Sequence, residues 1–187
     1  MRYHPRMTLD ERDFVCERLR GFLQLLLQNM EGLNHAQWNF KPSEKAWSIA
    51  QCVEHLTEVE IGVNDSIQTL LFNGAGDPQL CSEAKGKERL LLRAVPNRTR
   101  HAEAPRQPAN NPIFATQPIA ERALKDVRSR TLSFAQSTEH DLEKYVMPHF
   151  VFGQLNIYQW LLMLSLHCER HAAQIIEIKE DPGFPPA

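Results

Sequence analysis

Apolar residues recur at three- and four-residue intervals in four long segments of the chain, the spacing that places them on one face of an α-helix. The first segment begins at Thr8, where the residues TLDE have the Ser/Thr-x-x-Glu pattern of a capped helix start. Gly32 and Asn34 interrupt the pattern at its other end. The apolar positions between them are Val15, Leu19, Phe22, Leu23, Leu26 and Met30. A stripe of this width predicts a helix that packs against other helices.

The second segment repeats the start signal, with Ser48 as the N-cap and Gln51 three residues later. At about 100° per residue, one sector of this helix contains Cys52, Leu56, Val59, Val63, Ile67 and Leu70. His55 lies on the shoulder of the stripe, roughly 75° from its centre by the same count. The helix is expected to end between Asn73 and Gly76, which favour the left-handed conformation of a C-cap.

The third and fourth segments lie in the second half of the chain. The third is predicted to run from about Ile119 to Glu139, opened by Thr116 and Pro118, and is the most polar of the four. The fourth is predicted from about Gln154 to Lys179, after a loop over Met147–Gly153. One face of it contains Ile157, Trp160, Leu161, Leu164, His167, Cys168, His171, Ile175 and Ile178.

Residues 77–117 form a long connection between the second and third segments, broken by five prolines. Only residues 85–95 have enough helix formers and apolar side chains for a short helix. No segment shows a strand pattern of comparable strength. The pattern therefore predicts an all-α four-helix bundle with a long crossover connection between helices two and three. The chain of 187 residues, 1–187, is expected to form a single domain.

The composition indicates which kinds of binding partner and which cellular compartment to expect. The 21 basic and 23 acidic residues nearly balance, so we expect neither nucleic acid nor a membrane surface as a partner. No apolar run approaches the roughly 20 residues that span a bilayer, and the first residues lack the apolar core of a secretory signal. The four cysteines show no CxxC spacing, as expected for reduced thiols. These features favour a cytoplasmic protein.

Two histidines lie inside the apolar stripe of the fourth segment. His167 and His171 are one helical turn apart, with Cβ atoms roughly 5–6 Å from each other, so both rings can bind one metal ion. His55, on the shoulder of the second helix, can supply a third ligand if helices two and four are neighbours. The alternative is that each ring hydrogen-bonds a neighbouring helix and fills space in the core.

The residues around these histidines resemble a known family. The segment WNFKPSEKAWSIAQCVEHLTEVE, residues 38–60, is similar to the W-S-I-x-x-x-x-x-H-L signature of the DinB/YfiT superfamily. LHCERHAAQI, residues 166–175, is similar to its H-x-x-x-H-x-x-Q-I motif. The resemblance implies a four-helix bundle with a long connection between helices two and three. It also implies a divalent metal bound by His55, His167 and His171.

Three neutral imidazoles leave a divalent metal open to a water or thiol ligand, so both hydrolysis and thiol transfer are compatible with such a site. Since the superfamily includes thiol-dependent enzymes, the resemblance implies a metal-dependent S-transferase or hydrolase, with a small-molecule substrate and in some cases a low-molecular-weight thiol. Zinc, nickel, iron and copper all accept imidazole, so the metal is not specified. A non-catalytic metal-binding protein and a structural or stress-response bundle that forms homodimers remain open alternatives.

Several other side chains are candidates for supporting roles. Cys52 or Cys168 could add a thiolate ligand, although a buried cysteine is more commonly a small apolar residue. Gln174 could hydrogen-bond a ligand ring, and His149 could border a pocket at the end of the bundle. Trp47 and Trp160 are interpreted as core aromatics.

One basic cluster, made by Arg98, Arg100, His101 and Arg106, is interpreted as a solvated loop, with binding of an anionic thiol as the alternative. Glu54, Glu58 and Glu169 neighbour the histidines in sequence, but their angular positions point mostly away from the metal face. No catalytic base is therefore assigned.

Overall fold

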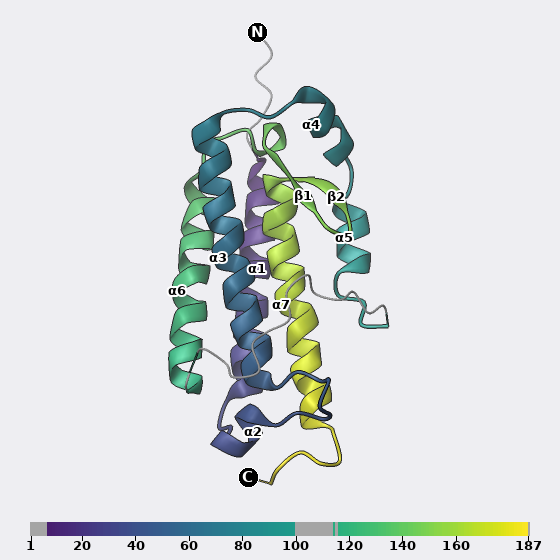
Figure 1. Cartoon of the computed structure of the whole chain (residues 1–187). Coiled ribbons are helices and arrows are strands. Elements are labelled where there is room, and N and C mark those ends of the chain that lie inside the picture. Colours follow the sequence, from purple (N-terminus) through teal and green to yellow (C-terminus); the bar gives the residue numbers. More distant parts are fainter. Residues whose placement is uncertain (1–6, 100–113, 115, 187) are drawn as a thin grey trace.

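Four long helices form the body of the protein, in a computed structural model that describes residues 7–99, 114 and 116–186 (Figure 1). They are α1 (Leu9–Met30), α3 (Ile49–Asn73), α6 (Gln117–Ser137) and α7 (Ile157–Lys179). The predicted four-helix bundle is confirmed. The third helix begins and ends two residues earlier than the sequence pattern indicated.

Local hydrogen bonds explain where these helices begin. Thr8 and Glu11 form the predicted reciprocal cap of α1, and Ser48 and Gln51 form that of α3. Gly74, with a φ angle of 92°, ends α3 within the predicted range. Thr116 occupies the N-cap position of α6 without a side-chain hydrogen bond, followed by a proline in the first turn.

Each long helix packs against two others, α1 against α6 and α7, and α3 against α6 and α7. The neighbours α3 and α6 run in the same direction, as do α1 and α7 (Figure 1). A chain that leaves α3 at one end of the bundle must therefore return to the other end before α6 begins. The long crossover connection between the second and third long helices is thus observed, and it follows from this parallel pair.

The crossover has structure of its own. It contains α4 (Pro78–Ala84) and α5 (Glu88–Ala94), of which α5 packs on α7. Helix α5 lies within residues 85–95, where the sequence predicts a short helix. A further short helix, α2 (His35–Asn39), lies between α1 and α3 and is capped reciprocally by Asn34 and Gln37. These short helices span five to seven residues, too few for apolar periodicity to reveal them.

The predicted loop over Met147–Gly153 is wrong. After the short 3-10 turn η1 (Leu142–Lys144), strands β1 (Val146–His149) and β2 (Gly153–Asn156) pair as an antiparallel hairpin. Residues 150–152 form a three-residue hairpin loop. Gly153 follows this loop with a φ angle of 66°, a left-handed conformation that is common at the end of such loops. The last helix consequently starts at Ile157 rather than Gln154, with Asn156 and Gln159 as its reciprocal cap.

The apolar interior is divided into two clusters along the bundle axis. One cluster includes Leu19 and Val63, and the other includes Leu26 and Val53. Polar side chains are buried at the level between the two clusters. They include Glu60 on α3 and Arg128 on α6. His167 also falls there, since Leu166 belongs to one cluster and Cys168 to the other. Within the described ranges, no helix is both long and apolar enough to cross a membrane.

Candidate metal centre

His55, His167 and His171 converge at the contact between α3 and α7. The Nε2 atom of His167 lies 3.3 Å from Nε2 of His55 and 3.0 Å from Nε2 of His171. All three rings lie within 4.8 Å of one another, measured between their nearest potential ligand atoms. The predicted grouping of three residues from distant parts of the chain is therefore present in the fold.

The two helices place these rings by different means. His167 and His171 are one turn apart on α7, so their side chains lie one above the other on the same face. His55 reaches them from the antiparallel neighbour α3. His55 and His167 are half-buried, whereas only 5% of His171 is exposed. The cluster thus lies at the edge of the core.

The three rings cannot satisfy one another's hydrogen-bonding groups. A neutral imidazole has one N–H and one lone pair, so three Nε2 atoms that face one another cannot all be paired. The Nδ1 atoms of His167 and His171 are buried, and neither has a hydrogen-bond partner within the described part of the chain. With the protons on Nδ1, three lone pairs would face a common point, and a cation there would balance them.

The distances match what a cation requires. A tetrahedral ion with bonds of about 2.0–2.1 Å to imidazole nitrogen has ligand atoms roughly 3.3–3.4 Å apart. The observed separations of 3.0 and 3.3 Å are close to this edge length. Two of the three separations therefore match a tetrahedral divalent metal, and all three ligand atoms lie within 4.8 Å of one another.

Burial keeps the three rings neutral. It lowers the pKa of His55 to about 4. Burial, followed by the nearby charge of His55, lowers the pKa of His167 to about 3. Burial also lowers the pKa of His171 well below its ordinary value. Neutral imidazole is the form that binds metal, so the cluster is ready for a cation near pH 7.

Trp47 forms one wall of the cluster, a role that the sequence analysis missed. Its ring lies nearly parallel to that of His171, with centroids 5.8 Å apart and planes 3° from parallel. The same ring meets His55 edge-on at 4.9 Å. Trp47 is half-buried and lies just before α3, outside any helical pattern. Helical periodicity therefore gave no signal for this contact.

The thiols do not join the histidines. Among the described residues, the cluster of potential ligands contains neither Cys52 nor Cys168. Burial raises the pKa of Cys52 to about 12 and that of Cys168 to about 11, so both thiols stay protonated. Cys168 donates a hydrogen bond to the carbonyl of Phe22. Both behave as buried apolar side chains.

Gln174 does not reach the ligand rings but accepts a 3.3 Å hydrogen bond from Arg98. Arg98 also pairs with both carboxylate oxygens of Glu177, at 2.6 Å each. This arginine is thus bound to α7 rather than solvated in a loop. Arg100, His101 and Arg106, the other members of the predicted basic cluster, lie outside the described residues.

The remaining candidates have clear positions. Trp160 is 8% exposed and belongs to the core, as predicted. His149 ends strand β1 and packs against Trp160, with ring centroids 5.2 Å apart. Glu54 is buried, with 1% of its surface exposed, and falls outside the ligand cluster.

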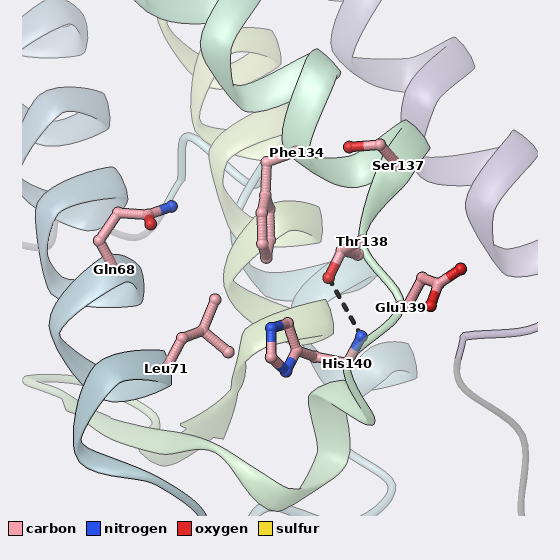
Figure 2. A pocket seen from close by; sticks show the side chains of 7 residues that line it. All are labelled: Gln68, Leu71, Phe134, Ser137, Thr138, Glu139 and His140. Atoms are coloured by element: carbon pink, nitrogen blue, oxygen red, sulfur yellow. Dashed lines mark hydrogen bonds between the residues drawn. The ribbon is translucent and has the colours of Figure 1, made fainter.

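A surface cavity of about 570 Å³ lies elsewhere, between α3 and the end of α6. Figure 2 shows Phe134 directed into it between Gln68, Leu71 and His140. Gln68 is thirteen residues beyond His55, or about 20 Å along α3. This cavity is therefore separate from the histidine cluster.

Known proteins are similar to this chain in sequence and in fold. The profile of the DinB superfamily matches residues 18–175. The uncharacterized protein YuaE of Bacillus subtilis is 32% identical over 154 residues, which cover 81% of this chain and 88% of YuaE. The solved structure of YfiT from Bacillus subtilis, described as a probable metal-dependent hydrolase with an unusual four-helix bundle topology, has a TM-score of 0.59 at 15% identity. That match covers 98% of this chain and 95% of YfiT. The chain belongs to the DinB superfamily.

Proposed function

We propose that this protein is a divalent-metal-dependent enzyme that acts on a small electrophilic molecule, with His55, His167 and His171 as the metal ligands. Hydrolysis is the reaction we place first. Transfer of a low-molecular-weight thiol to the same kind of substrate is the related alternative.

The convergence of three Nε2 atoms, at 3.0 and 3.3 Å, carries this proposal. A structural role alone would favour rings that each pair with a neighbouring carbonyl or hydroxyl group. Here the Nε2 atoms of the three rings face one another instead, as expected for rings that share a cation. The cluster also draws its ligands from two helices, so a cation would join α3 to α7.

When bound, the metal supplies Lewis acidity, which lowers the pKa of a water or thiol ligand and polarises an electrophilic oxygen. The protein's own residues supply position and shielding. Three protein ligands leave coordination positions open, in contrast to a closed structural site with four. Trp47 packs against the rings of His55 and His171 from one side.

The preference for hydrolysis is supported by the likeness of fold to YfiT, whose description as a probable metal-dependent hydrolase applies to that protein. Protonated Cys52 and Cys168 are unsuited to act as nucleophiles themselves, so a thiol reaction would need an external thiol. A small-molecule substrate fits the edge of the core, where His55 and His167 are half-buried.

The test uses untagged protein loaded separately with Zn²⁺, Ni²⁺, Fe²⁺ or Mn²⁺. Each form is assayed against small esters, amides and activated aryl halides, with and without glutathione, cysteine or bacillithiol. Turnover without thiol identifies a hydrolase, and turnover that requires thiol identifies a transferase. Either should be abolished in His171→Ala.

His35→Ala is the matched control, because His35 is exposed on α2 and lies outside the cluster. It should retain full activity. Activity that survives chelation, or that persists in a folded His171→Ala protein, would contradict the proposed site. Stoichiometric metal binding without turnover of any substrate would favour the non-catalytic alternative.

A further inference from the structure

The indole ring of Trp47 contacts two of the three ligand rings. Its plane is 3° from that of His171 with the centroids 5.8 Å apart, the offset stacking that aromatic rings prefer. It meets the ring of His55 at 4.9 Å, with the planes 66° apart. A twist of either imidazole about its bond to Cβ would disturb these contacts. One side chain therefore restricts ligand rings from both α3 and α7.

The ring of His171 depends on such a contact for its orientation. A metal-bound histidine is normally oriented by a hydrogen bond from its second ring nitrogen. The Nδ1 atom of His171 is buried, and among the described residues it has no hydrogen-bond partner. The torsion that turns a histidine ring is intrinsically soft. Stacking on Trp47 is thus the contact that defines the plane of this ring.

Two local structures hold the backbone on either side of Trp47. Before it, the amide of Ala46 donates to the carbonyl and the hydroxyl of Ser43, at 3.1 and 3.2 Å. After it, Ser48 and Gln51 exchange the hydrogen bonds of the α3 cap, at 3.0 and 3.2 Å. Both cap residues are buried. Trp47 therefore lies between a turn and a buried helix cap, which gives its ring a defined position.

We propose that Trp47 is a positioning residue for the metal ligands. Its ring serves in place of a hydrogen bond at Nδ1 of His171, and it keeps the Nε2 atoms of His171 and His55 directed at one point. This inference rests on the proposed function, which assigns the metal to the three histidines. It adds that a residue outside the ligand set controls how tightly the ion is held, through the rings that it restricts.

A purely structural role for Trp47 predicts something different. Trp47 also packs against the apolar cluster that includes Leu26 and Val53, so its loss can lower stability without changing the metal site. Phe40 offers the comparison. It is half-buried in the same segment before α3 and packs against the same cluster. Its ring meets that of Phe184 at 5.5 Å, away from the histidines.

The test measures Zn²⁺ binding to the untagged wild-type protein and to Trp47→Phe, Trp47→Leu and Phe40→Leu. Trp47→Phe keeps a flat ring at this position, whereas Trp47→Leu keeps an apolar side chain without one. Competition with a chromophoric chelator gives the dissociation constant of Zn²⁺. The visible absorption of Co²⁺-loaded samples reports the coordination geometry, and urea unfolding of metal-free samples reports stability.

We expect the dissociation constant of Zn²⁺ to rise about tenfold or more in Trp47→Leu and to stay within about threefold of wild type in Trp47→Phe. The Co²⁺ spectrum should change in Trp47→Leu and match wild type in Trp47→Phe. Phe40→Leu should lose stability while its Zn²⁺ affinity and Co²⁺ spectrum stay those of wild type. This pattern separates orientation of the ligands from packing of the core.

Wild-type affinity and spectrum in Trp47→Leu would overturn the role of Trp47. Equal losses of affinity in Trp47→Phe and Trp47→Leu would also overturn it, because they would depend on side-chain volume rather than on a flat ring. A loss in Phe40→Leu as large as that in Trp47→Leu would do the same, as a sign of general destabilisation. Failure of the wild-type protein to bind Zn²⁺ would instead overturn the proposed function, and this inference with it.

Discussion

Glu60 on α3 and Arg128 on α6 form a two-pronged ion pair in the middle of the bundle, with N–O distances of 2.7 and 2.8 Å. Each residue is 1% exposed. Thr131 donates a further hydrogen bond to Glu60, and Arg128 donates to the backbone carbonyl of Leu19. The pair therefore joins the parallel helices α3 and α6 to α1, at the level that separates the two apolar clusters.

Removing one partner of this ion pair should lower the stability of the protein strongly. Glu60→Ala leaves the guanidinium of Arg128 buried without its carboxylate, so we expect a loss of about 3–5 kcal/mol in the free energy of unfolding, measured with urea. The double replacement Glu60→Leu with Arg128→Met should lose much less, because neither charge remains. Lys125→Ala, which removes an exposed pair with Glu121, should cost under about 1 kcal/mol. Equal losses for Glu60→Ala and Lys125→Ala would show that the buried pair has no special role.

Trp47 should report metal binding directly. Its ring lies 4.9 Å from His55 and 5.8 Å from His171, so a paramagnetic ion at the cluster should quench its fluorescence. We expect a saturable decrease when Co²⁺ or Ni²⁺ is titrated into the untagged protein. Trp47→Phe should lose most of this decrease and still bind the ion, as measured by calorimetry. Undiminished quenching in Trp47→Phe would place the ion elsewhere.

The stability of the metal-free protein should fall as the solution is acidified. Burial lowers the pKa of His55 to about 4 and of His167 to about 3, so both rings stay neutral in the folded chain. Below pH 6.5 the unfolded chain binds protons at these rings and the folded chain does not, which favours unfolding. Each ring should contribute a slope of about 1.4 kcal/mol per pH unit between pH 6 and its folded pKa.

Urea denaturation between pH 7 and 5 measures this slope, and His55→Ala should make it shallower by one ring. Added Zn²⁺ should raise stability at pH 7 and lose its effect toward pH 5, because protons compete for the same nitrogens. A metal-free slope that is identical in His55→Ala and wild type would contradict the burial of this ring as a neutral group.

Lys87 should stabilise the hairpin. Its ammonium group donates to the backbone carbonyls of Phe152 and Gln154, at 2.8 Å each, on either side of Gly153. Lys87→Met should cost about 1.5 kcal/mol in the free energy of unfolding and increase amide exchange in the hairpin. Lys85→Met is the matched control, since Lys85 is exposed and should tolerate the change. Comparable exchange in the two variants would mean that Lys87 does not hold the hairpin.

Local signals in the sequence were enough to predict the long helices. The caps at Thr8 and Ser48 depend on side chains three residues apart, so they can be read from the chain alone. Helical periodicity placed His167 and His171 on one face of α7 and His55 on the shoulder of the α3 stripe, but grouping the three required α3 and α7 to be neighbours. The resemblance of residues 38–60 and 166–175 to the DinB/YfiT superfamily indicated the same three residues.

Features that depend on tertiary contacts were missed. Each strand of the hairpin has four residues, too few for alternation to stand out. Arg128 occupies a core position of α6 only because Glu60 meets it from another helix. Trp47 lies outside the helical pattern, and its stacking on His171 depends on how the turn before α3 folds back. A stretch of sequence does not reveal its partner in such cases.

Metal content is the most direct test of the central claim that three imidazoles from α3 and α7 hold one divalent ion. Untagged wild-type protein, dialysed against trace-metal-free buffer after reconstitution, should contain one ion per chain by elemental analysis. His55→Ala and His167→Ala should fall to near zero while retaining helical circular dichroism, and His35→Ala should match wild type. Wild-type protein without metal, or full occupancy in the folded His55→Ala variant, would contradict the account.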